Sequence, residues 1–152
     1  MPPLEALLAW FHFVCIFALV GTLVSEMALY RRHLDLARLT TLRRVDMWYG
    51  ISAGLVILSG ILRVGFGLKG AAFYLHNPIF WTKMGFFVAI ALLSIPPTIH
   101  YIRLGGRADA SGKVTVDPGG YRRMWALLGV EVVLLACIPF LAALLALGLP
   151  GF

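Results

Sequence analysis

Hydrophobic positions along the chain gather into four long runs, and polar or glycine-rich stretches separate these runs. The runs cover residues 4–30, 48–66, 79–102 and 121–147. A helix that crosses the hydrocarbon core of a bilayer needs about 20 predominantly apolar residues, and each run has about this length. The pattern therefore predicts an all-α integral membrane protein, in which four transmembrane helices form one bundle and residues 1–152 form one domain.

The composition agrees with a lipid environment. Hydrophobic residues make up 61% of the chain and charged residues only 13%, whereas soluble domains carry about 25% charged residues. Four tryptophans lie near the ends of the runs, where their rings suit the membrane interface: Trp10, Trp48, Trp81 and Trp125. No basic segment precedes the first run, so we expect a retained span rather than a signal peptide. Cys15 and Cys137 lie inside runs, and a disulfide framework is therefore not expected.

The basic residues indicate how the helices are oriented. The formal net charge is +6, and ten of the thirteen Lys and Arg residues lie in or beside the first and third connections: Arg31, Arg32, Arg38, Arg43, Arg44, Arg103, Arg107, Lys113, Arg122 and Arg123. Under the positive-inside rule these connections face the cytoplasm, and both termini lie on the outer side. Because this placement explains the charge, no nucleic-acid partner is expected.

The same two connections carry local structural signals. Residues 31–45 combine leucines with arginines, which fits either a short amphipathic helix on the inner leaflet or a solvated basic linker. The third connection is rich in glycine, and we expect it to be flexible. Asp117 followed by Pro118 is typical of an N-cap and a first-turn proline, and this pair predicts the start of the fourth helix.

Polar side chains within the first run share one helical face. His12, Cys15, Leu19, Thr22 and Glu26 follow each other in alternating steps of three and four. Ionisable groups inside a membrane are costly and usually face the bundle interior, so this face is predicted to point inward. In the orientation given above, His12 lies in the outer half of its helix and Glu26 lies near the inner surface.

Depth in the membrane divides the polar groups of all four runs into two clusters. The outer cluster is basic and contains His12, Arg63 and Lys83, with Trp81 nearby. The inner polar site is mixed, and its members are Glu26, Asp46, Tyr49, His100 and Glu131. Simpler interpretations stay open. Arg63 and Lys83 can snorkel to the headgroups, Glu26 can pair with an arginine of the first connection, and His12 can be a hydrogen-bonded structural residue.

Prolines and glycines mark special positions in two of the helices. Adjacent Pro96 and Pro97 remove backbone donors from the third run, which predicts either a plain kink or a polar cavity beside His100. Gly50 and Gly54 form a G-x-x-x-G pattern that suits close helix packing, within the bundle or between subunits. The expected partners are the lipid bilayer and, through these glycines, a second copy or another subunit of a membrane complex.

Five short motifs are spread over the chain: Asp46-x-x-Tyr49-Gly50-x-x-Ala53, Gly60-x-x-Arg63, Phe80-Trp81-x-Lys83, Ser94-Ile-Pro-Pro-Thr98, and Glu131 followed by Pro139 and Ala142-Ala143. Together they resemble a family of small bacterial four-helix membrane proteins of unknown function, which implies a multi-pass protein of the bacterial inner membrane. More distantly, the layout is similar to HemJ-type protoporphyrinogen oxidases and CopD-type copper-resistance membrane proteins. The HemJ resemblance rests on His12, Trp81 and Lys83 and implies a haem protein.

Three functional hypotheses follow from these patterns. The first is a redox protein that binds haem b, with His12 on the iron, Arg63 and Lys83 at the propionates, and His76 as the candidate sixth ligand. The second is copper(I) or other metal handling by a set of soft ligands, namely His12, Cys15 and Cys137. The third is a non-catalytic scaffold or accessory subunit. No catalytic residue can be assigned from the sequence, and enzymatic activity stays open.

Overall fold

The computed structural model describes residues 2–67 and 70–147. Its elements follow in the order α1 (Pro2–Leu29), β1 (His33–Asp35), α2 (Leu36–Phe66), α3 (Gly70–Leu75), α4 (Pro78–Leu104), the 3-10 turn η1 (Gly105–Arg107), β2 (Lys113–Thr115) and α5 (Pro118–Ala146). The helices α1, α2, α4 and α5 are long and apolar enough to cross a membrane. The prediction of an all-α bundle with four long apolar helices is therefore confirmed.

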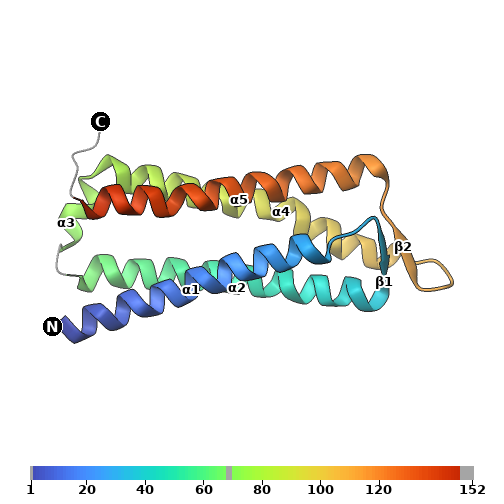
Figure 1. The fold of residues 1–152 in the computed structure, drawn as a ribbon, viewed down its shortest axis with the longest axis horizontal. Helices are drawn as coiled ribbons and strands as arrows, with labels where there is room; N and C mark the ends of the chain where they lie inside the picture. The colour runs from blue at the N-terminus through green and yellow to red at the C-terminus, as the bar shows by residue number, and fades with distance from the viewer. Residues whose placement is uncertain (1, 68–69, 148–152) are drawn as a thin grey trace.

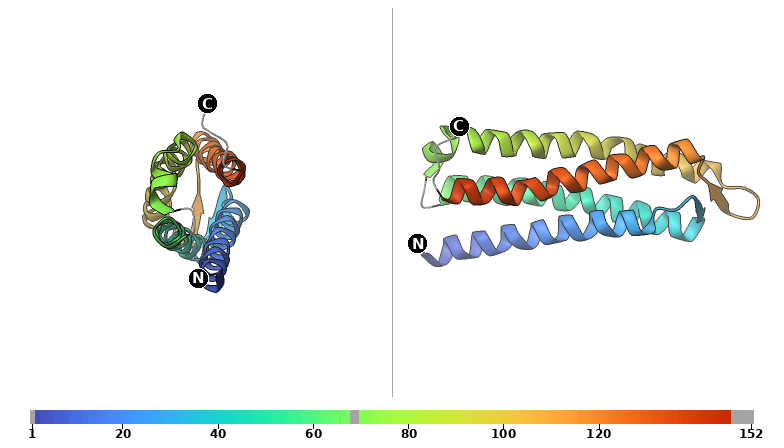
Figure 2. Two further views of the ribbon diagram at one scale, coloured as in Figure 1. Left: turned by 90° about the vertical axis from the view of Figure 1, so that its left-hand side faces the viewer. Right: turned by 45° about the horizontal axis from the view of Figure 1, so that its top comes forward.

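The four long helices run antiparallel to their sequence neighbours. Contacts are densest between α1 and α2 and between α4 and α5, and they are sparser between these two pairs. Seen along its length, the bundle has the four helices at the corners of an elongated rectangle, with α1 beside α2 and α4 beside α5 (Figure 2). One end carries β1 and β2, and the opposite end carries α3, the start of α1 and the end of α5 (Figure 1). We call these the basic end and the α3 end.

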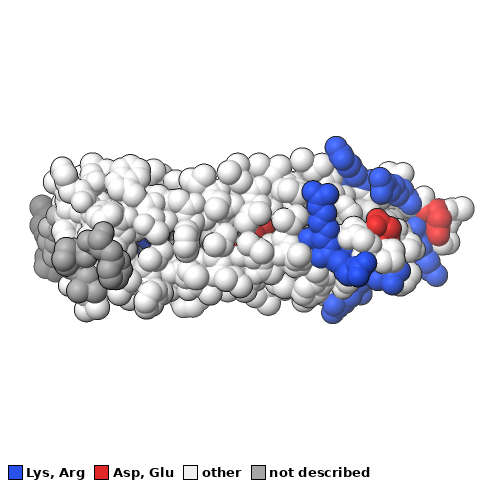
Figure 3. Space-filling view, turned by 90° about the horizontal axis from the view of Figure 1, so that it is seen from above, with Lys and Arg blue, Asp and Glu red and all other residues white. Residues whose placement is uncertain are grey.

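Basic side chains gather at the basic end of the bundle. Figure 3 shows Lys and Arg concentrated around the end that carries β1 and β2, while the middle of the visible face is almost free of charge. Both arginine-rich connections thus reach the same end of the bundle, as an even number of antiparallel helices requires. An asymmetry of this kind is what the positive-inside rule uses to orient a membrane protein.

The second helix begins earlier than the hydrophobic pattern predicts. It starts at Leu36, where the sequence suggested a separate amphipathic helix or a linker as far as residue 45. Asp35 caps it by accepting a hydrogen bond from the backbone N–H of Arg38 at 2.6 Å. Leu39 and Leu42 are buried against the core, so this segment is the first three turns of α2 and does not lie on a leaflet.

The first and third connections are joined by a small sheet that the sequence analysis missed. β1 and β2 pair antiparallel, with Leu34 opposite Val114. Leu34 and Val114 are buried while their neighbours in both strands are exposed, which is the alternation expected of a half-buried strand. Three-residue strands are too short to give a periodic signal, and their pairing links segments about 80 residues apart in the chain.

The third connection is more ordered than its glycine content suggests. Asp109 accepts hydrogen bonds from the backbone N–H groups of Ser111 at 2.8 Å and Lys113 at 2.9 Å, and from the Ser111 hydroxyl at 2.7 Å. Gly112 supplies the positive φ of 72° that the turn requires. The predicted cap of the fourth helix is confirmed, because Asp117 accepts from the backbone N–H of Gly120 at 2.7 Å and Pro118 opens α5.

Burial is uneven along the bundle. The half nearer the basic end contains the largest fully buried side chains, including Leu23, Tyr30, Tyr101 and Leu128. At the other end, no side chain described between residues 3 and 14 of α1 is buried. The basic half is therefore tightly packed, and the start of α1 is only partly covered, although Ser59 of α2, Ile79 of α4 and Leu145 of α5 are buried in the same half.

Candidate functional site

His12 is held by a serine on the neighbouring helix. Its Nδ1 lies 2.7 Å from the Ser59 hydroxyl oxygen. Ser59 also donates its hydroxyl proton back to the Leu55 carbonyl at 2.7 Å, with the Val56 carbonyl at 3.1 Å. A hydroxyl has a single proton, so this hydrogen-bond network assigns Nδ1–H as the donor to Ser59. The Nε2 atom then keeps its lone pair free.

Close packing of α1 on α2 places the imidazole ring beside a glycine. A Cβ atom built at Gly60 would lie 3.6 Å from His12 Cε1, which is ordinary contact distance. Gly60 therefore tolerates a side chain without displacing the ring, and the position of His12 is set by its hydrogen bond to Ser59.

Two cations accompany His12, as the sequence predicted for the outer cluster. Arg63 and Lys83 both act electrostatically on His12, and Arg63 acts on Lys83, so the three groups share one neighbourhood. In residues 2–67 and 70–147, no ion pair joins Arg63 or Lys83 to a carboxylate. This neighbourhood, which we call the cationic set, is defined by His12, Arg63 and Lys83.

Trp81 and His76 do not join the cationic set. The Trp81 indole is 57% exposed and donates to the Leu75 carbonyl at 2.9 Å. His76 is exposed, and its Nδ1 donates to the Ala72 carbonyl at 2.8 Å. Trp81 therefore closes the short link between α3 and α4, and no described contact connects His76 to His12.

The inner polar site is assembled from four helices. Glu26 and Glu131 have exposed fractions of 1% and 0%, and Tyr49 donates to Glu131 Oε2 at 2.9 Å. Asp46 accepts a hydrogen bond from the Thr98 hydroxyl at 2.7 Å. The carboxyl groups of Glu26, Asp46 and Glu131 lie close enough to interact electrostatically. We call these three the acidic set, and none of its members forms an ion pair within the described part of the chain.

Two polar atoms beside the acidic set lack hydrogen-bond partners among the described residues. They are Oε1 of Glu131 and the hydroxyl of Tyr101. The Tyr101 hydroxyl faces the Glu26 carboxyl group, but outside hydrogen-bond geometry. A buried polar group without a partner is costly.

His100 lies beyond the acidic set, towards the basic end. Its Nε2 is 3.0 Å from the Tyr30 hydroxyl, and the Tyr30 ring packs on Tyr101 and Tyr121. Burial raises the pKa of Tyr30, so its phenol keeps its proton at neutral pH. The sequence placed His100 within the inner polar site, and the structure connects it through the tyrosines rather than through a carboxylate.

Ser59, Thr98 and Tyr101 were not predicted as site residues. Ser59 could have been found, because Tyr49, Ser52, Val56, Ser59 and Arg63 follow steps of three and four along one face of α2. The helical spacing that identified the polar face of the first helix therefore identifies this face of α2 as well. Thr98 and Tyr101 follow the proline pair, where the direction of each side chain depends on the course of the helix.

Other predicted positions remain apart. Cys15 is buried and Cys137 half-buried, both as free thiols, and no group of three His, Cys, Asp or Glu side chains in the described residues lies close enough to hold a metal ion. Gly50 and Gly54 lie on the exterior of α2, and a Cβ at either would meet nothing within 4 Å. Their pattern thus does not serve packing within the bundle and is available to a partner.

Four long apolar helices around an interior of buried ionisable groups define a multi-pass helical membrane protein. The chain belongs to the family described as predicted membrane protein (DUF2214), whose profile matches residues 4–150. No curated protein and no solved structure matches it. The family has no stated activity, and these comparisons contain no link to HemJ-type or CopD-type proteins.

Proposed function

We propose that this protein is a membrane redox protein that binds haem b at the α3 end, with His12 as an axial ligand of the iron. The observation that carries the proposal is the hydrogen bond between His12 Nδ1 and Ser59. Metal-ligating histidines usually donate their other ring N–H to a fixed acceptor, which sets the tautomer and the ring orientation. Ser59 is such an acceptor, and it leaves Nε2 as the ligand atom.

The charges of the cationic set support the same proposal. Two cations beside a histidine repel each other and disfavour a third positive charge. Haem propionates are anions that arginine and lysine bind through charge-assisted hydrogen bonds. With no carboxylate paired to Arg63 or Lys83 in the described residues, a dianionic group is the ligand class that fits these cations. Snorkelling accounts for the cations as well, but it gives His12 no role.

Packing at the α3 end also favours a ligand there. No side chain described between residues 3 and 14 of α1 is buried, whereas Leu19, Leu23 and Glu26 further along the same helix are. A large planar group needs such incompletely filled space. In the positive-inside orientation, which we propose for this chain, the α3 end faces the outer side of the membrane.

The test is an absorption spectrum of protein purified from haem-replete cells. Wild type should show a Soret band, and His12→Ala should abolish it. His76→Ala is the matched control, because His76 is an exposed histidine near the same end and should leave the band unchanged. Ser59→Ala should keep haem but shift the reduced spectrum or the midpoint potential, while Ser52→Ala, seven residues away on the same face of α2, should not. Wild-type protein without a Soret band would end the proposal.

A second candidate function is proton handling by the acidic set. The observation that favours it is Glu131 Oε1, which is fully buried and has no partner among the described residues. Ionisable residues inside a bundle commonly mark proton or ion pathways. Three interacting carboxyl groups without a basic partner need a proton or cation to offset the cost of burial. The Tyr30–His100 pair lies between this set and the basic end.

Infrared difference spectra as a function of pH test this candidate. A carboxylic C=O stretching band that changes with pH should be present in wild type and absent or diminished in Glu131→Gln. Asp109→Asn is the control, because Asp109 is an exposed carboxylate outside the helices. An unchanged band in Glu131→Gln would show that Glu131 exchanges no proton.

A further inference from the structure

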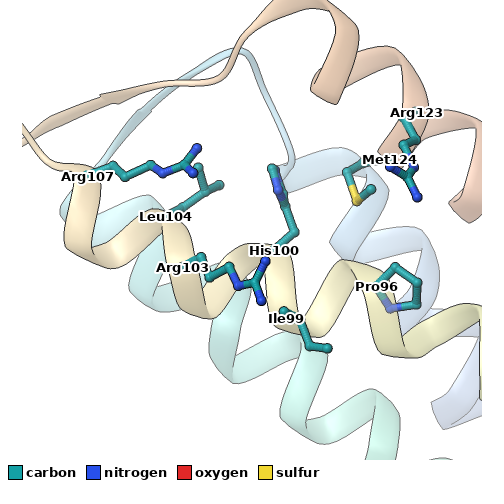
Figure 4. A pocket seen from close by; sticks show the side chains of 8 residues that line it. All are labelled: Pro96, Ile99, His100, Arg103, Leu104, Arg107, Arg123 and Met124. Carbon is teal, nitrogen blue, oxygen red and sulfur yellow. The ribbon is translucent and has the colours of Figure 1, made fainter.

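A cavity opens between α4 and α5 at the basic end. Its volume is about 350 Å³, and it is separate from both the cationic and the acidic sets. Three arginines and a histidine line it, together with apolar side chains that include Pro96 and Met124. Figure 4 shows Arg103, Arg107 and Arg123 around the opening, with His100 between α4 and α5. Pro96 thus borders a cavity beside His100, the sharper of the two alternatives that the sequence left open.

The arginines of this cavity have no anionic partner among the residues that the structure describes. None of the three forms an ion pair with a carboxylate in the described ranges. The acidic group that acts on His100 is Asp117, which already caps α5 by accepting from Gly120. Guanidinium groups held around one cavity repel each other, so an anion that binds there removes an existing electrostatic cost.

His100 adds a further donor or acceptor. Its Nε2 is occupied by the Tyr30 hydroxyl, and its Nδ1 has no hydrogen-bond partner in the part of the chain that is described. The tyrosine therefore fixes the ring and leaves one nitrogen for a ligand in the cavity. A fixed imidazole and forked guanidinium donors match the several oxygens of a phosphate group.

We propose that this cavity binds a phosphate group, supplied by the headgroup of an anionic phospholipid. Two features favour a lipid over free phosphate. The arginines of the cavity lie close to the ends of the candidate spans of α4 and α5, and the apolar side chains of Pro96, Ile99 and Met124 line it beside them. Basic pockets between transmembrane helices on the cytoplasmic side bind anionic headgroups in this way.

Native mass spectrometry of protein taken from nanodiscs tests the proposal. The discs contain phosphatidylglycerol and phosphatidylcholine in equal parts, and wild type should retain phosphatidylglycerol preferentially. The double variant Arg103→Gln/Arg123→Gln should bind it roughly thirtyfold more weakly, as expected from the loss of two arginine contacts. Arg122→Gln is the matched control, because Arg122 is an exposed arginine of α5 next to Arg123 that does not line the cavity.

Each result of these measurements either supports or overturns the proposed phosphate site. The lipid site is supported if the double variant loses bound phosphatidylglycerol, Arg122→Gln keeps it, and the double variant has a normal melting temperature in neutral detergent. A melting temperature that inorganic phosphate raises in wild type but not in the double variant, without lipid enrichment, supports the phosphate site with a soluble ligand. Equal loss in Arg122→Gln, or no preference for phosphatidylglycerol and no response to phosphate, would overturn the proposal.

Discussion

The two polar sets of this bundle differ in how completely the protein surrounds them. Glu26 and Glu131 of the acidic set are buried in the dense core of the basic half and Asp46 is half-buried, whereas all three members of the cationic set are half-buried. Both contain ionisable groups without ion pairs within the described chain. Packed side chains thus surround Glu26 and Glu131, whereas the half-buried cationic set is the one that we propose a ligand completes.

The largest contrast should come from a buried and an exposed leucine towards the two ends of α1. Leu23 is 1% exposed and Leu7 is 58% exposed. Leu23→Ala leaves a cavity in the packed half and should lower the free energy of unfolding by about 2–5 kcal/mol. Leu7→Ala should change it by less than about 1 kcal/mol. Denaturation in a mild detergent measures both, and equal effects would mean that the packing difference has no energetic consequence.

Removing one hydrogen bond from each set should sharpen the comparison. Tyr49→Phe deprives the buried Glu131 carboxyl group of the hydrogen bond that the structure gives it, at a cost of about 1–3 kcal/mol. Ser59→Ala removes the hydroxyl that accepts the hydrogen bond of His12 Nδ1. Because His12 is half-buried, solvent can partly replace this acceptor, and the free energy of unfolding should fall by less than about 1 kcal/mol. Unfolding measured for both variants under the same conditions checks which one loses more stability. A larger loss of stability in Ser59→Ala than in Tyr49→Phe would contradict the prediction.

Acid should loosen the turn after η1. Hydrogen bonds from Ser111 and Lys113 hold the pKa of Asp109 below its ordinary value. The stability from a lowered carboxyl pKa is present above the unfolded value and is lost as pH falls through the folded value. Amide exchange at Ser111 and Lys113 should therefore quicken below about pH 4. Asp109→Asn should remove this pH dependence of amide exchange. If the pH dependence persisted in Asp109→Asn, another titratable group would be its cause.

The smallest effect is expected at the exterior glycines of α2. Gly54→Leu adds a side chain where no described atom lies within 4 Å, so the stability of a single chain should change by less than about 0.5 kcal/mol. If this face meets a second copy, the same substitution should reduce the oligomer measured by crosslinking in membranes. Gly21→Leu, at another open position, on α1, is the control. Identical oligomeric state in both variants would exclude Gly54 from an interface.

Features that depend on local pattern could be predicted from the amino-acid sequence. Four apolar runs of spanning length, the polar face of the first helix and the Asp117 cap follow from periodicity and capping chemistry, and all are present. The grouping of His12 with Arg63 and Lys83 also followed, because depth along antiparallel helices fixes which residues lie at one level.

Only the tertiary structure decided the contacts between segments distant in the chain. The start of α2 at Leu36 depends on leucines that become buried only when the core forms. Pairing of β1 with β2 and the hydrogen bond of Ser59 to His12 each join separate elements. The arginine cavity requires α4 and α5 to lie side by side. A helical period states which face a residue occupies, whereas the distance between two faces is set by how the helices pack.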